Sequence, residues 1–338
     1  MKIIAVVNQK GGCGKTITAV NLSAALSKNY RVLLIDLDPQ GHATFSLKAN
    51  TNFTITDIFE KISQEQPLPQ ESLFTSLSES FSIVSSSIGL ASLEHKLTSH
   101  SSKLRLLSSF LKIITGFDYV ILDCPPNLGV LTLNALFASD YCLIPLMACD
   151  FSLRGVEILK NILIMVKESS DKTPTPFFLL TQVDNRSRFS REFLDKTRQQ
   201  FGNLLLKTNI RTNVCLKEAV SRGEHIFNYK PYSRGAQDFT ELAKEIDRIT
   251  TKTAWAALFL KGKDLTDVYV VGDFNNWKKQ ETYKMSKIGD DIWSVNISLE
   301  KGKYRYKFIA EGKWFADPHN KLTENDNFGG KNSLIIAE

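Results

Sequence analysis

A glycine-rich stretch near the N-terminus, Lys10-Gly11-Gly12-Cys13-Gly14-Lys15-Thr16, limits the folds that are open to this chain of 338 residues. The apolar run before it, residues 3–7, has the length and the β-branched content of a buried strand. Residues 17–26 behind it have the small and apolar spacing of a packed helix. This context predicts a phosphate-binding loop, because backbone N–H groups and the positive end of a helix converge on one point. The predicted nucleotide contacts are Gly11, Gly12, Cys13, Gly14, Lys15, Thr16 and Ile17.

Two further apolar runs end in carboxylates. Residues 31–35 lead to Asp36 and Asp38, and residues 119–122 lead to Asp123. Ligands of open parallel sheets bind at the carboxyl ends of strands, so we expect these groups to meet the loop. Lys15 would reach the β- and γ-phosphates, and Thr16 would ligate magnesium, which Asp123 would hold through water. Asp36 is instead interpreted as a structural helper that hydrogen-bonds the loop.

Strands that alternate with helical segments predict an α/β domain with a mostly parallel, doubly wound sheet. Between residues 50 and 116 we expect a strand at 81–85 and helices at 90–97 and 104–111. All four tryptophans follow residue 250, and from residue 255 the pattern is one of short alternating strands. We therefore predict an α/β domain at 1–250, a connector of about four residues, and a small all-β sandwich at 255–338.

Composition indicates an ordinary globular protein, with 43% hydrophobic and 23% charged residues. There is no N-terminal signal, no apolar run of membrane-spanning length, and no metal-type or disulfide-type spacing among five cysteines. These features favour a reducing cytoplasm. The net charge of +6 is concentrated in residues 186–234, where 11 Lys and Arg face 4 acidic residues.

The loop departs from the usual pattern, since Gln9 replaces a glycine and Lys10 adds a second lysine. This resembles the deviant loop of the ParA/MinD family of ATPases, in which the early lysine reaches the partner's nucleotide across a dimer interface. Residues 36–41 resemble the first switch of that family. Residues 126–136, 213–223 and 232–236 resemble the chromosomal ParA (Soj) branch. The resemblance covers about residues 1–250, but Arg211 stands where the family usually has a proline, which leaves the adenine contacts open.

The resemblance implies a dimerising P-loop ATPase that uses ATP and Mg, with slow turnover that a ParB-like activator accelerates. Lys10, Lys15 and Asp38 would be catalytic, with Asp38 positioning the attacking water. The function would be DNA partitioning or intracellular cargo positioning, in the cytoplasm and on the nucleoid, without a membrane helix. Nonspecific DNA would bind the basic segment, although a solvated basic face is the alternative. The candidate DNA contacts are Arg186, Arg188, Arg211, Lys217, Arg222 and Arg234.

The C-terminal segment resembles the glycogen-binding module of AMP-activated kinase β subunits and of starch-branching enzymes. By that resemblance Trp277 and Trp314 would stack on glucose rings, and Lys307 and Asn332 would hydrogen-bond the hydroxyls. Phe328 would pack from a loop, whereas Trp293 is expected in the core. A sandwich kept only for protein contacts is the alternative for this module.

Three functions stay open at this point. The first is DNA partitioning with the sandwich as an interaction domain, and the second is positioning of a glucan-bearing cargo. The third is regulation of polysaccharide metabolism or secretion without DNA binding.

Overall fold

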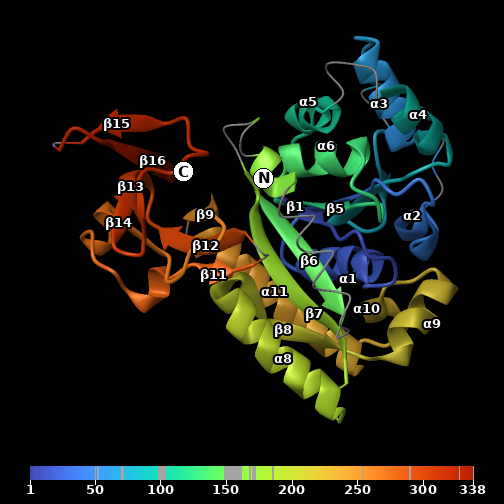
Figure 1. Cartoon of the computed structure of the whole chain (residues 1–338). Coiled ribbons are helices and arrows are strands. Elements are labelled where there is room, and N and C mark those ends of the chain that lie inside the picture. The colour runs from blue at the N-terminus through green and yellow to red at the C-terminus, as the bar shows by residue number, and fades with distance from the viewer. Residues whose placement is uncertain are drawn as a thin grey trace.

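The computed structural model is described for residues 1–49, 51, 53–69, 72–97, 104–147, 162–166, 169, 173–184, 186–252, 254–288, 291–326 and 328–337. Figure 1 shows a larger part, in which helices surround a sheet, and a smaller part built from strands of the C-terminal segment. No helix within these ranges has the length and apolar character needed to cross a membrane.

The sheet of the larger part has the strand order β3-β4-β2-β5-β1-β6-β7-β8. Its pairs are parallel except β3 with β4. The strands are apolar and mostly buried, as strands covered on both faces must be. They span β1 (Lys2–Val6), β2 (Val32–Asp36), β3 (Thr75–Ser76), β4 (Phe81–Val84), β5 (Tyr119–Asp123), β6 (Tyr141–Met147), β7 (Thr175–Val183) and β8 (Leu205–Arg211).

Helices cover both faces of this sheet and bury two separate apolar clusters against it. One face carries α3 (Ile55–Ser63), α4 (Gly89–Leu97), α5 (Leu106–Ile113), α6 (Val130–Ala138) and α8 (Arg188–Phe201). The other carries α1 (Lys15–Leu26), α9 (Val214–Arg222), α10 (Ile226–Tyr229) and α11 (Arg234–Lys252). The short α2 (His42–Ser46) follows β2, and the 3-10 turn η1 (Gly202–Leu204) precedes β8. The predicted doubly wound α/β architecture is therefore confirmed.

The smaller part contains two antiparallel sheets that share one apolar core. One sheet has the order β10-β13-β16-β15 with β14 beside β13, and the other has the order β11-β12-β9. Trp293 is 8% exposed within this core, as predicted. The strands are β9 (Ala254–Lys261), β10 (Tyr269–Gly272), β11 (Ser286–Lys287), β12 (Ile292–Leu299), β13 (Gly302–Ala310), β14 (Lys313–Phe315), β15 (Thr323–Asn325) and β16 (Lys331–Ala337), with 3-10 turns η2 (Asp273–Asn275) and η3 (Glu281–Tyr283).

The two parts share a buried contact. Phe259 and Ile292 of the smaller part are almost fully buried in an apolar cluster of the larger one. The side-chain amide of Asn296 donates to the Pro176 carbonyl over 2.7 Å, and the backbone carbonyl of Asn296 accepts from Asn203 Nδ2 over 2.7 Å. Because α11 continues to Lys252, only residue 253 separates it from β9. The expected four-residue connector is therefore wrong, and the joined surfaces restrict the orientation of the smaller part.

Candidate functional site

The glycine-rich loop connects β1 to the first turn of α1. Gly12 and Gly14 have φ of 73° and 90°, a left-handed conformation that residues with a side chain rarely adopt. Gly14 is the N-cap of α1, and Lys15 opens the helix while only 8% exposed. The Lys15 ammonium donates to the Lys10 carbonyl over 3.2 Å, so both lysines lie at the same loop. The predicted contact residues from Gly11 to Ile17 thus surround one helix N-terminus.

The strand register brings the predicted carboxylates to this loop. Asp123 of β5 pairs with Val6 of β1 on one side and with Asp36 of β2 on the other. These residues end three adjacent parallel strands, so the two carboxylates lie beside the start of the loop. Asp38 follows two residues after the end of β2 and is 6% exposed.

Asp123 has the environment of a metal-side carboxylate. Its side chain is fully buried, and neither carboxylate oxygen has a hydrogen-bond partner among the described residues. Burial, followed by the charge of Asp36, raises its pKa well above the ordinary value, whereas the nearby Thr16 hydroxyl favours the charged form. Unpartnered buried oxygens call for a ligand, and oxygen donors suit Mg²⁺. Thr16 and Asp123 are therefore the residues that would hold a magnesium ion beside the loop.

The other two carboxylates have different surroundings. Asp36 accepts hydrogen bonds from the Thr44 amide and hydroxyl, each over 2.8 Å, and from the Asp38 amide over 3.1 Å. These bonds fit the expected structural role, although they go to residues 38 and 44 and not to the glycine-rich loop. Burial raises the pKa of Asp36 to about 6. Asp38 accepts from the Gln40 amide over 3.0 Å and lies 3.9 Å from His42 Nδ1. It is thereby held at the turn that leads into α2.

Sequence analysis missed two residues that hold the loop from β7. The Thr181 hydroxyl donates to the Cys13 carbonyl over 2.8 Å, and the Gln182 amide donates to the Gly12 carbonyl over 2.7 Å. Gln182 has φ of 54°, at an irregularity in the pairing of β7 with β8. Such bulges re-aim side chains next to active sites. No sequence motif marks Thr181 and Gln182, because their contacts join residues about 170 positions apart in the sequence.

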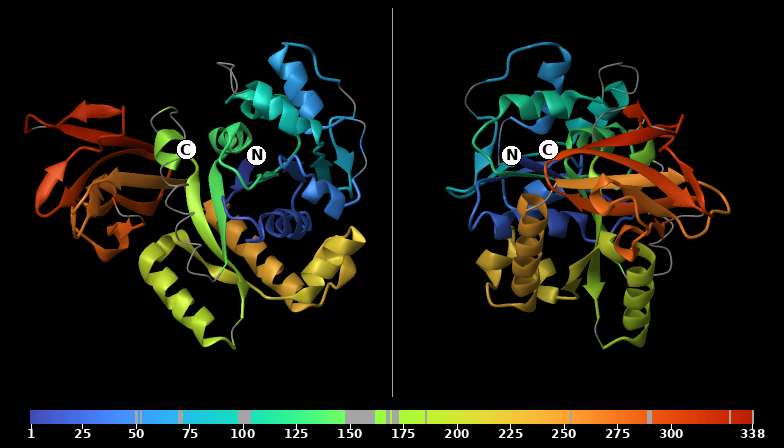
Figure 2. Two further views of the ribbon diagram at one scale, coloured as in Figure 1. Left: turned by 45° about the vertical axis from the view of Figure 1, so that its right-hand side comes forward. Right: turned by 90° about the vertical axis from the view of Figure 1, so that its left-hand side faces the viewer.

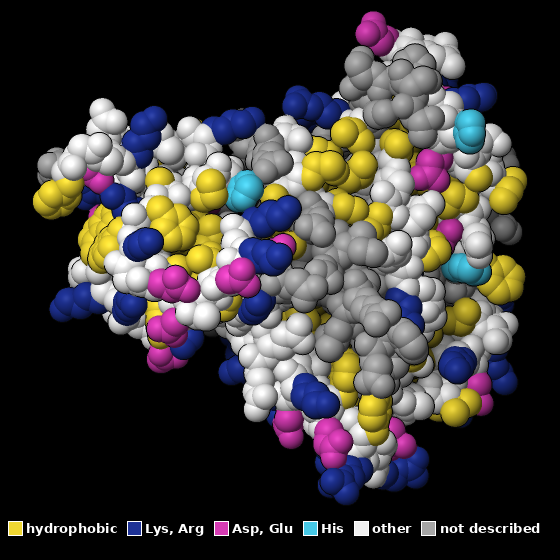
Figure 3. All heavy atoms as spheres, in the orientation of Figure 1, with side chains coloured by type: hydrophobic (Ala, Val, Ile, Leu, Met, Phe, Trp, Pro, Cys, Tyr) yellow, Lys and Arg dark blue, Asp and Glu magenta, His cyan; other side chains and the backbone are white. Residues whose placement is uncertain are grey.

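The predicted DNA-binding residues lie on two separate surfaces. Figure 2 shows α8 and α9 apart from each other in both views. Arg186 and Arg188 lie at the start of α8, where they pair with Asp184 and Glu192. Figure 3 shows basic and acidic side chains interleaved at this lower end. The basic segment is thus not one continuous surface, because β8 separates its two parts.

The other candidates belong to α9 and its surroundings. Lys217, Arg222 and Arg234 are exposed there, with the Arg222 guanidinium 4.9 Å above the Tyr229 ring. Arg211 differs from them, since its guanidinium and backbone amide hydrogen-bond the carboxylate of Asp238. This pairing engages the charge of Arg211 within the protein and makes it the weakest of the candidate DNA contacts.

The predicted glucan residues line one cleft of the smaller part. Trp277, Trp314, Lys307 and Asn332 border a cavity of about 350 Å³. The two indole rings are stacked with centroids 6.3 Å apart, and Trp314 is half exposed. Phe328 is 95% exposed at the rim, as its predicted loop position requires.

Polar groups hold the cleft in place. Lys307 pairs with Asp326, whose pKa it lowers to about 2. Arg305 pairs with Asp273, which also accepts from the Trp277 indole over 3.1 Å. Sequence analysis had not singled out Arg305, Asp273 or Asp326, which carry no motif of their own.

A glycine loop at a helix N-terminus, beside a buried carboxylate at a strand end, defines the class of P-loop nucleotide-binding proteins. The chain matches the AAA domain family over residues 1–174. The sporulation initiation inhibitor protein Soj of Bacillus subtilis is 37% identical over 250 residues, which are 72% of this chain and 98% of that protein. The chromosome partitioning protein ParA of Myxococcus xanthus is 34% identical over 248 residues, with coverage of 72% and 87%. The chain therefore belongs to the ParA/MinD family of P-loop ATPases, as the sequence predicted.

One structural neighbour has been solved with nucleotide and magnesium bound. Cobyrinic acid a,c-diamide synthase from Mycobacterium smegmatis has been solved with ADP and magnesium and with an ATP analogue and magnesium. It is 28% identical, with a TM-score of 0.62 over 74% of this chain and 96% of that chain. Residues 259–338 match the family described as the glycogen recognition site of AMP-activated protein kinase, in line with the second resemblance.

Proposed function

We propose that residues 1–250 form a Mg-ATP-dependent ATPase that dimerises when it binds ATP, and that residues 255–338 form a glucan-binding domain. The observation that carries the ATPase assignment is the buried, unpartnered Asp123 carboxylate at the level of the Lys15 loop. The neighbour's complexes with nucleotide and magnesium support it.

Each residue has a defined role in this proposal. The loop amides and the Lys15 ammonium hold the phosphates and stabilise charge that develops on the γ-phosphoryl group. Thr16 and Asp123 hold magnesium, which supplies further charge neutralisation when bound. Asp38 orients the attacking water, and Lys10 reaches the nucleotide of the second subunit. We expect slow turnover that an activating partner increases.

The test of the nucleotide site is a Lys15→Ala variant studied by calorimetric titration with ATP and magnesium. It should lose ATP binding, while Lys112→Ala, on an exposed part of α5, should bind like the unchanged protein. Lys10→Ala should keep ATP binding but lose ATP-dependent dimerisation in analytical ultracentrifugation. Undiminished binding by Lys15→Ala would refute the site.

For DNA we propose the surface of Lys217, Arg222 and Arg234, because these cations are exposed together around α9. The name of the Myxococcus relative, a chromosome partitioning protein, supports a DNA-related role. Phosphate contacts release counterions, so affinity should fall steeply with salt. Filter binding with ATP should lose most of its signal in a Lys217→Ala, Arg222→Ala double variant. Salt-insensitive binding, or binding without ATP, would argue against this surface.

For the smaller part we propose recognition of a glycogen-like glucan by the two stacked indoles. A Trp277→Ala, Trp314→Ala double variant should lose co-sedimentation with glycogen and keep ATPase activity. Tyr232→Ala, which removes a 93% exposed ring of the larger part, is the matched control. Equal sedimentation of the double variant would identify the module as a protein-contact domain.

The combined function that these parts support is ATP-dependent positioning of a glucan-bearing cargo on DNA. Repeated epitopes of a branched glucan would turn weak single-site binding into avidity. The alternative is regulation of polysaccharide metabolism or secretion, which requires no DNA. Co-sedimentation with glycogen and with DNA, each with and without ATP, separates the two, because only the first predicts ATP-dependent binding to both.

A further inference from the structure

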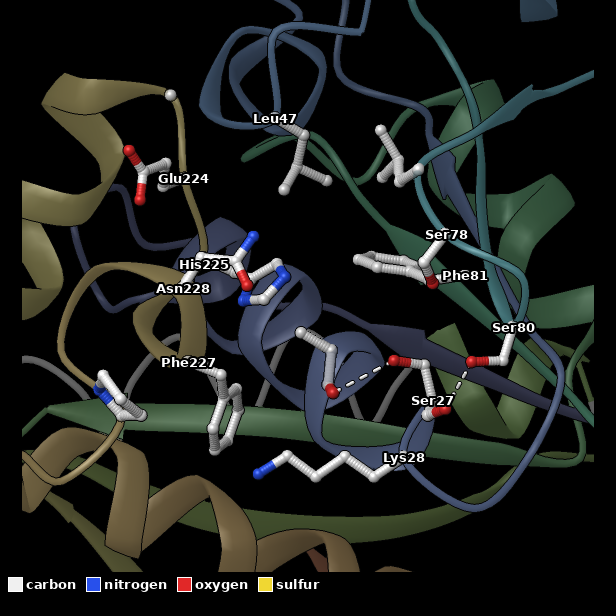
Figure 4. A pocket seen from close by; sticks show the side chains of 14 residues that line it. Ser27, Lys28, Leu47, Ser78, Ser80, Phe81, Glu224, His225, Phe227 and Asn228 are labelled. Atoms are coloured by element: carbon white, nitrogen blue, oxygen red, sulfur yellow. Dashed lines mark hydrogen bonds between the residues drawn. The ribbon is translucent and has the colours of Figure 1, made fainter.

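A second cavity of the larger part lies away from the nucleotide loop. It has a volume of about 540 Å³ and is bordered by the end of α1, Leu47 after α2, the β3–β4 turn and the segment that leads into α10. Figure 4 shows side chains from these four elements around the hollow. Lys28, at its edge, follows the 12-residue α1, whose other end carries Lys15. Since a helix rises 1.5 Å per residue, roughly 18 Å separate the cavity from the loop.

The polar groups around the cavity carry opposite charges. Lys28 contributes an ammonium group, Glu224 a carboxylate, Asn228 an amide and Ser78 a hydroxyl. An anionic ligand would face Glu224, and a cationic ligand would face Lys28. A neutral ligand with many groups that both donate and accept hydrogen bonds can pair with all four of these side chains.

His225 adds an unsatisfied group to this lining. Its Nδ1 atom is buried and has no hydrogen-bond partner among the described residues. The imidazole lies between the Phe81 and Phe227 rings, each with its centroid 6.2 Å away. Burial lowers its pKa, so the ring is neutral at pH 7. Because Nδ1 is closed to solvent, a ligand in the cavity would meet His225 through Nε2, which donates or accepts according to the tautomer of the ring, and a ligand hydroxyl suits either case.

Apolar side chains complete the walls. Leu47, Leu77 and Phe81 also line the cavity and add carbon surface to it. The C–H faces of a sugar ring pack on such surface while its hydroxyls pair with polar groups. A volume of about 540 Å³ lies within the range of small-molecule sites and has room for one or two sugar rings.

We propose that this cavity is a binding site for a neutral mono- or disaccharide. It is separate from the glucan cleft of the smaller part, so it does not depend on the function proposed there. The ligand would contact α1, the residue after α2, and the segment before α10. The Ile226 amide already donates to Asn21 of α1 over 2.8 Å, so the sugar joins elements that are in contact.

The experiment uses the full chain with Trp277→Ala and Trp314→Ala, so that the glucan cleft cannot contribute. Calorimetric titration with glucose and with maltose should show saturable binding of one sugar per chain, in the millimolar range. His225→Phe keeps a ring but removes the nitrogen atoms, and should weaken binding about tenfold. His95→Phe, an exposed histidine on α4, is the matched control and should leave binding unchanged.

Other outcomes overturn the proposal. No saturable binding of either sugar refutes it, as does equal affinity in His225→Phe. If circular dichroism shows that His225→Phe is unfolded, Glu224→Ala replaces it and must weaken binding. Inorganic phosphate that binds and displaces the sugars would show an anion site instead. ATP binding measured on the same samples distinguishes failure of this site from failure of the nucleotide site.

Discussion

Replacement of Asp123 by Asn should stabilise the protein in the absence of nucleotide and metal. The carboxylate is fully buried, neither oxygen has a partner among the described residues, and its pKa is raised. The folded state therefore favours the protonated acid, and ionisation at neutral pH works against folding. A neutral amide of the same shape does not ionise, so it removes this loss of stability.

The magnitude follows from the cost of burying an unsatisfied group. An unpartnered buried polar group costs about 1–3 kcal/mol, and a charged group costs more. The neighbouring Asp36 offers a comparison, since its pKa rises from 3.8 to about 6. For such a carboxyl, the stability that depends on the protonated acid is lost as pH rises toward 6. For Asp123→Asn we expect a gain of about 1–3 kcal/mol, or roughly 2–10 °C in Tm.

The assay is thermal unfolding of both proteins in EDTA between pH 4.5 and pH 8. A raised carboxyl pKa contributes no penalty below its ordinary value and the full penalty above its folded value. The amount by which the Tm of Asp123→Asn exceeds that of the unchanged protein should therefore be largest at pH 8 and should shrink as pH falls toward 4.5. With ATP and magnesium the unchanged protein should have the higher Tm of the two, because ligand binding stabilises the protein that retains the metal-side carboxylate.

Two results would refute the reasoning. One is a variant that unfolds at the same or a lower temperature than the unchanged protein at pH 8 in EDTA. The other is an advantage that grows as pH falls, which would mean that the carboxylate is stabilised in its charged form. Glu79→Gln, at an exposed carboxylate of the β3–β4 turn, serves as the control for charge removal.

Four further substitutions, at three positions, test other parts of the structure. Gln182→Leu removes a donor to the loop and should weaken ATP binding about 3- to 10-fold in titrations. Gln182→Gly should weaken it equally but unfold at a higher temperature than the Leu variant, because glycine tolerates the positive φ. Gly272→Ala places a Cβ 2.3 Å from the Arg305 carbonyl, so it should abolish glycogen co-sedimentation while ATPase activity persists. Asn296→Ala removes the side-chain hydrogen bond to the Pro176 carbonyl, while the Asn296 backbone carbonyl still accepts from Asn203, so stability should fall by about 0.5–1.5 kcal/mol in urea unfolding.

Local features of the site were predictable from the sequence. The loop depends on consecutive residues, and the carboxylates follow apolar runs whose alternation with helices implies a parallel sheet. The strand and helices expected between residues 81 and 111 are also present, as β4, α4 and α5. These elements were predictable because their apolar spacing reflects the face that each one buries.

Contacts between distant residues were not predictable. The side chains of Thr181 and Gln182 meet the loop only because β7 lies one strand away from β1 in the sheet, with β6 between them. The basic residues between 186 and 234 were expected to form one surface because charge was counted along the chain. In the structure β8 separates those near α8 from those around α9. Likewise, the pairing of Arg211 with Asp238 depends on α11 lying against β8.

The buried contact between the two parts has a mechanical consequence. Since Phe259 and Ile292 are packed into the larger part, the sandwich can rotate independently only if this buried contact opens. A rotation of the nucleotide-binding part should therefore carry the sandwich and its stacked indoles with it. The sandwich therefore acts as a lever arm, in which a small angular change near the loop becomes a larger displacement of whatever the cleft holds.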